Sequence, residues 1–202
     1  MKTTTSSATQ KCFLALAGAT CFTLGIATPS LAASLSYTGT TVGEATWSRP
    51  LANGVNPPVA LAAVGTNVPF SAFQFNVDTT GAYDFLSTST DPANWDNYTF
   101  LYVNSFDSTN PLDNIVIANN NFPTKGLSGF NNVSLTAGLN YFLVTSGFAD
   151  ADAGAFLNTI SSANRIIAGP ATPIPTPALL PGLIGMGITL LRKKKANSAE
   201  TL

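Results

Sequence analysis

Six oxygen-bearing side chains that could bind a hard metal ion lie in one polar part of the chain. They are Asp107, Asp113, Asn114, Asn119, Asn120 and Asn121. Calcium takes roughly six to eight oxygen ligands, so convergence of these residues predicts a calcium site, the only cofactor that we expect. Their spacing matches neither an EF-hand loop nor a nonapeptide repeat. The alternative is that these side chains close turns by bonding to their own backbone.

One aromatic side chain is predicted to face solvent and to stack on a sugar. Trp95 lies in the polar segment Asp91-Pro92-Ala93-Asn94-Trp95-Asp96, and a flat ring with a polar edge suits glycan binding. The other candidates for such a platform, Trp47, Tyr98, Tyr102 and Tyr141, are expected mostly in the core.

Two pairs of carboxylates, Asp91 with Asp96 and Asp107 with Asp113, could serve as the acid and base of a glycosidase. Both pairs lie in turn-rich segments, where we expect solvated aspartates and no neighbour that raises a pKa. We therefore predict no catalytic residue and no enzymatic activity.

The chain contains no histidine. This excludes Ser-His-Asp and Cys-His catalysis and histidine-ligated zinc. Both cysteines, Cys12 and Cys21, lie in the predicted signal peptide. We therefore expect neither a disulfide nor thiol chemistry in the mature protein.

The basic residues are concentrated at the chain ends, which leaves the body acidic. Residues 34–170 carry nine carboxylates against Arg49, Lys125 and Arg165, a net charge of −6. Such a body repels polyphosphates, so we expect no nucleic-acid partner.

Short β-branched and aromatic runs, separated by Gly, Asn, Asp and Pro, predict an all-β domain over residues 34–166. The expected strands are Ala45–Ser48, Ala60–Val64, Phe70–Val77, Ala82–Thr88, Tyr98–Asn104, Asn114–Ala118, Asn132–Leu135, Asn140–Ser146 and Ala155–Ile160. Their number and spacing favour an antiparallel two-sheet sandwich or jelly roll. Tight turns at Gly81 and at Ala137-Gly138 predict β-hairpins.

The first 33 residues have the pattern of a signal peptide. Lys2 and Lys11 precede the apolar run Cys12–Ala27, and Ser30 and Ala32 form an A-x-A-like site. Signal peptidase is therefore an expected partner, with cleavage after Ala32 or Ala33. The alternative is an uncleaved N-terminal membrane anchor.

The C-terminal part divides into a linker, an apolar segment and a tail. Residues 167–177 form a Pro-rich linker, which prolines hold extended. Residues 178–195 are a predicted hydrophobic helix for sorting or membrane insertion, ending in the basic cluster Arg192, Lys193, Lys194 and Lys195. Its fourteen uncharged residues reach about 21 Å as a helix, short of the roughly 30 Å hydrocarbon core. Residues 196–202 form a short tail. The alternative for 178–195 is an amphipathic or buried terminal helix, which three glycines and a proline disfavour.

The segment from Pro175 to the basic cluster resembles a known class of C-terminal signals. The motif Pro175-Thr176-Pro177-Ala178, the Gly-rich apolar stretch and the basic cluster resemble the PEP-CTERM class of sorting signals, and more narrowly its cyanobacterial PTPA variant. The resemblance implies processing by an exosortase-type membrane protease and export to the surface or the extracellular matrix. Pro-Thr-Pro replaces the Pro-Glu-Pro of the broader class.

The body resembles the pre-peptidase C-terminal type of bacterial β-sandwich. The resemblance rests on residues 77–85, 96–102, 106–107, 111–114, 117–121 and 135–145. It implies an accessory module that attaches to surfaces or substrates. Related modules often carry aspartates where Asn119, Asn120 and Asn121 stand here.

Together these features predict an exported, non-catalytic surface protein with a binding module. Extracellular polysaccharide is the expected ligand, and the membrane is contacted through the C-terminal segment. The alternatives are a purely structural matrix protein without a specific ligand and a secreted hydrolase.

Overall fold

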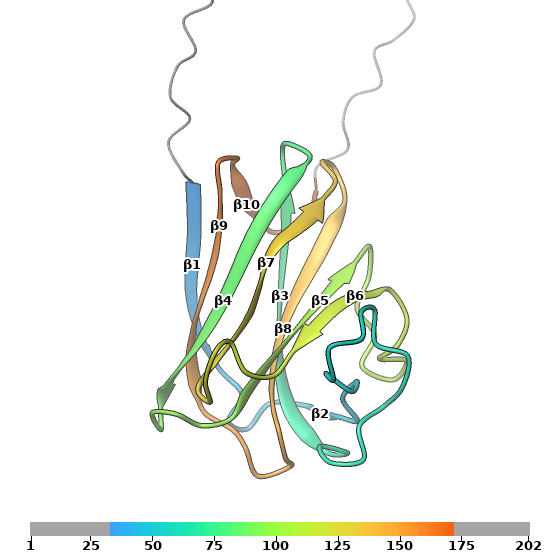
Figure 1. Ribbon diagram of the computed structural model, residues 1–202, viewed down its shortest axis with the longest axis vertical. Helices are drawn as coiled ribbons and strands as arrows, with labels where there is room; N and C mark the ends of the chain where they lie inside the picture. The colour runs from blue at the N-terminus through green and yellow to red at the C-terminus, as the bar shows by residue number, and fades with distance from the viewer. Residues whose placement is uncertain (1–32, 172–202) are drawn as a thin grey trace, which may run out of the picture.

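The computed structural model describes residues 33–171, which form two antiparallel β-sheets and contain no helix. The first sheet has four strands in the order β1-β9-β4-β7. The second has the order β10-β3-β8-β5-β6, with β2 paired to β3. Figure 1 shows the two sheets packed face to face. The prediction of an all-β domain with two antiparallel sheets is therefore confirmed.

Alternation of inward and outward side chains explains most of the strands. In β4, for example, Tyr83, Phe85 and Ser87 point inward, whereas Leu86 is exposed. The strands are β1 (Ala33–Thr40), β2 (Thr46–Trp47), β3 (Val68–Val77), β4 (Gly81–Asp91), β5 (Asn97–Val103), β6 (Ile115–Asn119), β7 (Leu127–Leu135), β8 (Asn140–Gly147), β9 (Ala155–Ser162) and β10 (Ile166–Ala168).

Three sequence-based expectations about strands are wrong. Ala60–Val64 is not a strand, since Leu61 makes only one isolated bridge, to Pro50. β1 and β10 were not predicted, because Ser, Thr and Gly dilute the apolar signal in the first and the second has only three residues. Both predicted hairpins are also wrong: the turns at Gly81 and Gly138 join strands of different sheets.

Two apolar clusters hold the fold together. One fills the space between the sheets, where Phe75, Phe85 and Leu143 meet Ile160. The other covers the outer face of the six-stranded sheet, where Trp47 packs against Phe100 and Tyr102. Around this second cluster the six-stranded sheet is buried on both faces, whereas the outward side chains of β1 in the four-stranded sheet are exposed.

A polar layer adjoins the cluster between the sheets. The amide of Asn158 in β9 donates to Thr145 Oγ1 in β8 at 2.8 Å, and that of Asn97 in β5 donates to Ser87 Oγ in β4 at 2.9 Å. All four residues are fully buried. Because these bonds join opposite sheets, they fix the lateral position of one sheet on the other.

The described chain begins and ends at the same pole of the sandwich. β1 starts there at Ala33, and the segment after β10 leaves there at Ala171 (Figure 1). Ala171 N donates to Asn140 Oδ1, and Asn76 Nδ2 donates to Gly169 O. The exit of the chain is therefore tied to β3 and β8.

The predicted signal peptide, most of the linker, the segment 178–195 and the tail lie outside the described residues. Within residues 33–171, no helix has the length and apolar character needed to cross a membrane.

Candidate functional site

Asp107, the first predicted calcium ligand, closes a turn after β5. Its Oδ1 accepts from Thr109 N at 2.8 Å and from Thr109 Oγ1 at 2.7 Å, and its Oδ2 accepts from Asn110 Nδ2 at 2.8 Å. These hydrogen bonds, led by that from Asn110, lower the pKa of Asp107 to about 2. Both carboxylate oxygens of Asp107 thus already accept hydrogen bonds within the turn.

We predict that Asp107 titrates near pH 2 in the folded protein and that Asn110→Ala moves its pKa up toward the ordinary value of about 3.9. A lowered folded pKa stabilises the protein above the unfolded pKa, and this contribution is lost as the pH falls from about 4 through about 2. Carboxyl-carbon NMR measures both titrations. A wild-type midpoint near pH 4 would contradict the hydrogen-bonded turn.

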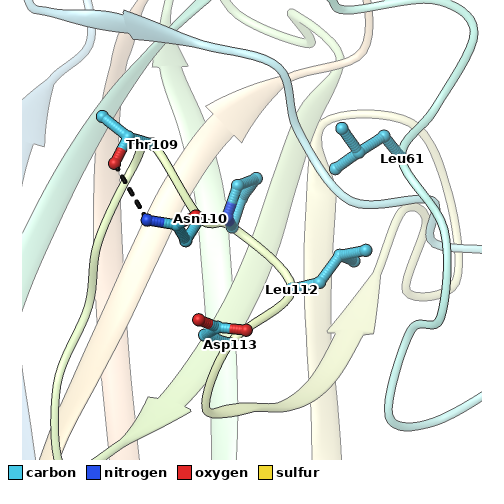
Figure 2. A pocket seen from close by; sticks show the side chains of 6 residues that line it. Leu61, Thr109, Asn110, Leu112 and Asp113 are labelled. Atoms are coloured by element: carbon cyan, nitrogen blue, oxygen red, sulfur yellow. Dashed lines mark hydrogen bonds between the residues drawn. The ribbon is translucent and has the colours of Figure 1, made fainter.

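Asp113, the second predicted ligand, lies on the rim of a small pocket. The pocket has a volume of about 230 Å³ and is lined by Leu61, Thr109, Asn110, Pro111, Leu112 and Asp113. Figure 2 shows Leu61 across from the turn that carries Leu112 and Asp113. Typical small-molecule sites occupy roughly 300–1,000 Å³, so this pocket is smaller than most.

Asn119 and Asn120 lie at the other end of the β5–β6 pair. Asn119 is opposite Thr99, near the start of β5, and its backbone carbonyl accepts from Ser128 Oγ at 2.9 Å. The amide oxygens of both asparagines are buried and have no hydrogen-bond partner among residues 33–171. Asn121 is exposed.

The structure therefore separates the predicted calcium ligands into two groups. The strand β6, Ile115–Asn119, lies between the two groups, and its four residue steps span roughly 13 Å. Asn114 belongs with the Asp107 group, where its amide donates to Ser105 Oγ. The set does not form one coordination sphere, and within residues 33–171 no three Asp or Glu side chains cluster as a metal site.

Trp95 is buried, so the prediction that it faces solvent is wrong. Its ring is 5% exposed, and Nε1 donates to Ala155 O at 2.9 Å. The polar neighbours of Trp95 in sequence lie on the surface, whereas its ring packs beside Gly154, which has no side chain to exclude it. Trp95 cannot present its face to a glycan in this conformation.

Asp96 corrects another expectation, that no carboxylate here has a raised pKa. Burial is the main cause that raises the pKa of Asp96, while Lys125 and Arg49 act against it. Its Oδ1 has no hydrogen-bond partner among residues 33–171. Asp91, its proposed partner, is exposed at the end of β4.

Arg49 was not predicted to have a structural role, but it is only 2% exposed. Its Nε and Nη2 donate to Phe148 O at 3.1 and 2.9 Å, and its Nη1 donates to Pro50 O at 3.2 Å. The guanidinium carbon lies 4.2 Å from the centre of the Tyr98 ring. Arg49 therefore joins the loop after β2 to the loop after β8.

The outer face of the four-stranded sheet carries mostly hydroxyl side chains and few charges. We call it the hydroxyl face. Its side chains come into register across β1, β9 and β4 in three rows. They are Thr38, Leu157 and Thr88; Ser36, Thr159 and Leu86; and Ser34, Ser161 and Asp84.

The hydroxyl face can exchange hydrogen bonds in both directions, because every Ser or Thr hydroxyl donates and accepts. Ser36 Oγ and Thr159 Oγ1 already lie 2.9 Å apart, which shows that neighbouring strands share the array. Leu86 and Leu157 add exposed apolar area, at 39% and 37% exposure. Asp84 is the single carboxylate of the three rows. A surface with many hydroxyls and one carboxylate can exchange hydrogen bonds with a neutral polar polymer.

One sequence signal could have identified this face. Residues 34–40 alternate Ser, Leu, Ser, Tyr, Thr, Gly and Thr, which is the period of a half-buried strand. The other strands of this face, however, come from residues 81–91 and 155–162. Pairing between such distant segments is not visible in one sequence.

No protein-family model matches this chain, and no curated protein matches it significantly in sequence.

Proposed function

We propose that the chain is an exported, non-catalytic cell-surface or matrix protein whose C-terminal signal is of the PTPA type. In this proposal, signal peptidase removes residues 1–32 or 1–33, and an exosortase-type protease processes the tail. The described β-sandwich is the binding module, with a jelly-roll-like connectivity, and the flanking segments are a signal peptide and a short hydrophobic helix.

One observation supports the proposal most directly: the first and last described residues lie at the same pole of the sandwich. The segment after β10, up to Ala171, lies at the pole where β1 begins (Figure 1). Attachment through the tail would leave the loops at the opposite pole and the hydroxyl face accessible. The ties from Asn140 and Asn76 to residues 171 and 169 hold the exit in this direction.

The start of β1 is also compatible with the proposed cleavage. Ala33 is the first strand residue and pairs with Ser162. Cleavage after Ala32 leaves this strand whole, whereas cleavage after Ala33 removes its first residue.

For the processing, we predict the masses of two products in the native host. Protein recovered from wall or medium lacks 32 or 33 N-terminal residues and ends near Pro175–Ala178. Intact-mass analysis of membrane, wall and medium fractions measures both ends. A membrane-bound product that is intact through Leu202 would mean that the tail is an anchor and that the processing proposal is wrong.

For binding, we propose extracellular polysaccharide as the ligand of the hydroxyl face. We predict that the double variant Leu86→Glu/Leu157→Glu lowers affinity for the host polysaccharide at least about tenfold, since it adds two charges to the polymer contact. Affinity electrophoresis measures the change. Val59→Glu is the matched control, because Val59 is 77% exposed on the loop that follows β2.

The outcome for the wild type separates the alternatives. No retention of the wild-type protein would favour the purely structural matrix protein. Equal retention of the double variant and of Val59→Glu would place the binding surface elsewhere on the molecule. Release of reducing ends from the polysaccharide would favour the hydrolase.

A further inference from the structure

The edges of the two sheets differ in how well they are protected from pairing with another chain. An edge strand offers unpaired N–H and C=O groups, and natural proteins usually block it with short strands, bulges, proline, charge or a covering loop. Four places in residues 33–171 form such edges: β7 and β1 in one sheet, and β6 and the β10/β2 side in the other.

Three of these edges carry a protective feature. β7 is broken by a register shift opposite Tyr83 and Phe85, and Asn132 there has a φ of 56°. β6 has only five residues, and the loop residue Asn56 caps Ala118 N at 3.0 Å. The remaining edge consists of β10, with three residues, and β2, with two.

β1 lacks the short length, bulge, proline and charge of these edges, and β10 of the other sheet comes close to it without a backbone hydrogen bond to residues 34–40. The eight residues of β1 pair with β9 in unbroken register from Ala33 with Ser162 to Thr40 with Ala155. It contains neither a charged residue nor a proline. In Figure 1, β1 lies at the outer margin of its sheet.

The free side of β1 has no hydrogen-bond partner within residues 33–171. One residue in two of an edge strand directs its backbone N–H and C=O away from its neighbour. Apart from the ladder with β9, no backbone group of residues 34–40 makes a hydrogen bond with another described backbone group. Ser34, Ser36 and Thr38 are exposed beside this edge.

We propose that β1 is a self-association edge, which pairs antiparallel with β1 of a second copy of this chain. The four-stranded sheets of the two copies then form one continuous eight-stranded sheet about a twofold axis.

A second copy fits this edge because the edge is complementary to itself. A twofold axis through Ser36 sets Ser34 of one copy opposite Thr38 of the other, so that hydroxyls face hydroxyls on the outer side. Leu35 and Tyr37 fall on the inner side. No like charges meet along the strand, although the body as a whole has a net charge of −6.

The antiparallel arrangement has a consequence that rests on the proposed function. β1 runs away from the pole that holds both chain ends (Figure 1), so pairing places the two C-terminal exits at opposite ends of the dimer. Two copies anchored side by side in one membrane cannot adopt this pairing. The proposal thus applies to released copies or to copies on facing surfaces.

Sedimentation velocity of the exported protein, as its host produces it, tests the proposal. We expect the wild type to show a concentration-dependent monomer–dimer equilibrium. The double variants Ser34→Lys/Thr38→Lys and Ser34→Glu/Thr38→Glu are each expected to raise the dimer dissociation constant at least about tenfold, because like charges then face each other. An equimolar mixture of the two variants should recover the dimer, because opposite charges then face each other.

Ser134→Lys on β7 is the matched control, since Ser134 is an exposed residue of the interrupted edge. Circular dichroism establishes that each variant is folded. A monomeric wild type at all accessible concentrations, an equal effect of the control, or a mixture that fails to associate would each overturn the proposal. All variants share the same tail, so association through the tail does not respond to them. A failure of tail processing would appear in the intact mass of the protein, which is measured separately from its sedimentation.

Discussion

Replacing Arg49 by alanine is expected to lower the free energy of unfolding by about 3–5 kcal/mol. The guanidinium is almost fully buried and donates to the carbonyls of Phe148 and Pro50. Alanine would leave both carbonyls without this donor, open a cavity and remove the contact with the Tyr98 ring. For a domain whose stability is typically about 5–15 kcal/mol, this is a large fraction.

The midpoint and slope of urea unfolding measure this loss. Arg49→Lys should cost less than alanine, because it keeps the charge and part of the volume but loses the paired contact of Nε and Nη2 with Phe148 O. Arg165→Ala is the matched control, since Arg165 is exposed, and it should change stability by less than about 0.5 kcal/mol. If the Arg49→Ala and Arg165→Ala midpoints coincide, Arg49 does not hold the two loops together.

Gly129→Ala is expected to destabilise the protein by more than about 4 kcal/mol, or to prevent folding. Gly129 lies opposite Leu86 in the β4–β7 pair. A Cβ atom at this position would overlap the backbone carbonyl of Phe85 and would lie 3.1 Å from Leu86 Cα. Backbone atoms of a central strand cannot move aside without disrupting the ladder, so β7 would separate from β4.

The control is Gly43→Ala, which separates crowding from backbone conformation. Gly43 has a φ of 79°, and no atom lies within 4 Å of an added Cβ. The loss of stability expected for Gly43→Ala comes only from the left-handed backbone conformation and is roughly 1–2 kcal/mol. Chemical unfolding of both variants gives the comparison. Similar losses in the two proteins would show that the close approach of β4 to Gly129 is not the cause.

Eight of the nine predicted strands correspond to observed ones, and in seven of these the ends differ by only a few residues. In β4 the alternation was sufficient, because Tyr83 and Phe85 are buried while Leu86 is exposed. The aromatic and β-branched residues of β5 identified that strand although it buries side chains on both faces. The exception in length is β7, which begins at Leu127 rather than Asn132, since Gly129 and Asn131 weaken its β-propensity.

The sites were harder to predict than the strands. Side-chain type suggested that Asp107, Asp113 and Asn119–Asn121 share an ion, but β5 and β6 hold the two groups at opposite ends. The polar surroundings of Trp95 in sequence suggested exposure, but the ring enters the space left by Gly154. Arg49 gave no signal, because a charged residue is rarely buried without a carboxylate partner.

The sequence by itself determined that the described chain is all-β and that histidine chemistry is absent, because alternation and composition are local properties. Only the tertiary structure decided which strands share a sheet, which face stays open and which edge stays unprotected. The hydroxyl face joins residues 34–38, 84–88 and 157–161. The exposed edge of β1 exists because β9 covers only one of its two sides. Such features depend on pairings between segments far apart in the chain, and their energies arise only when the segments meet.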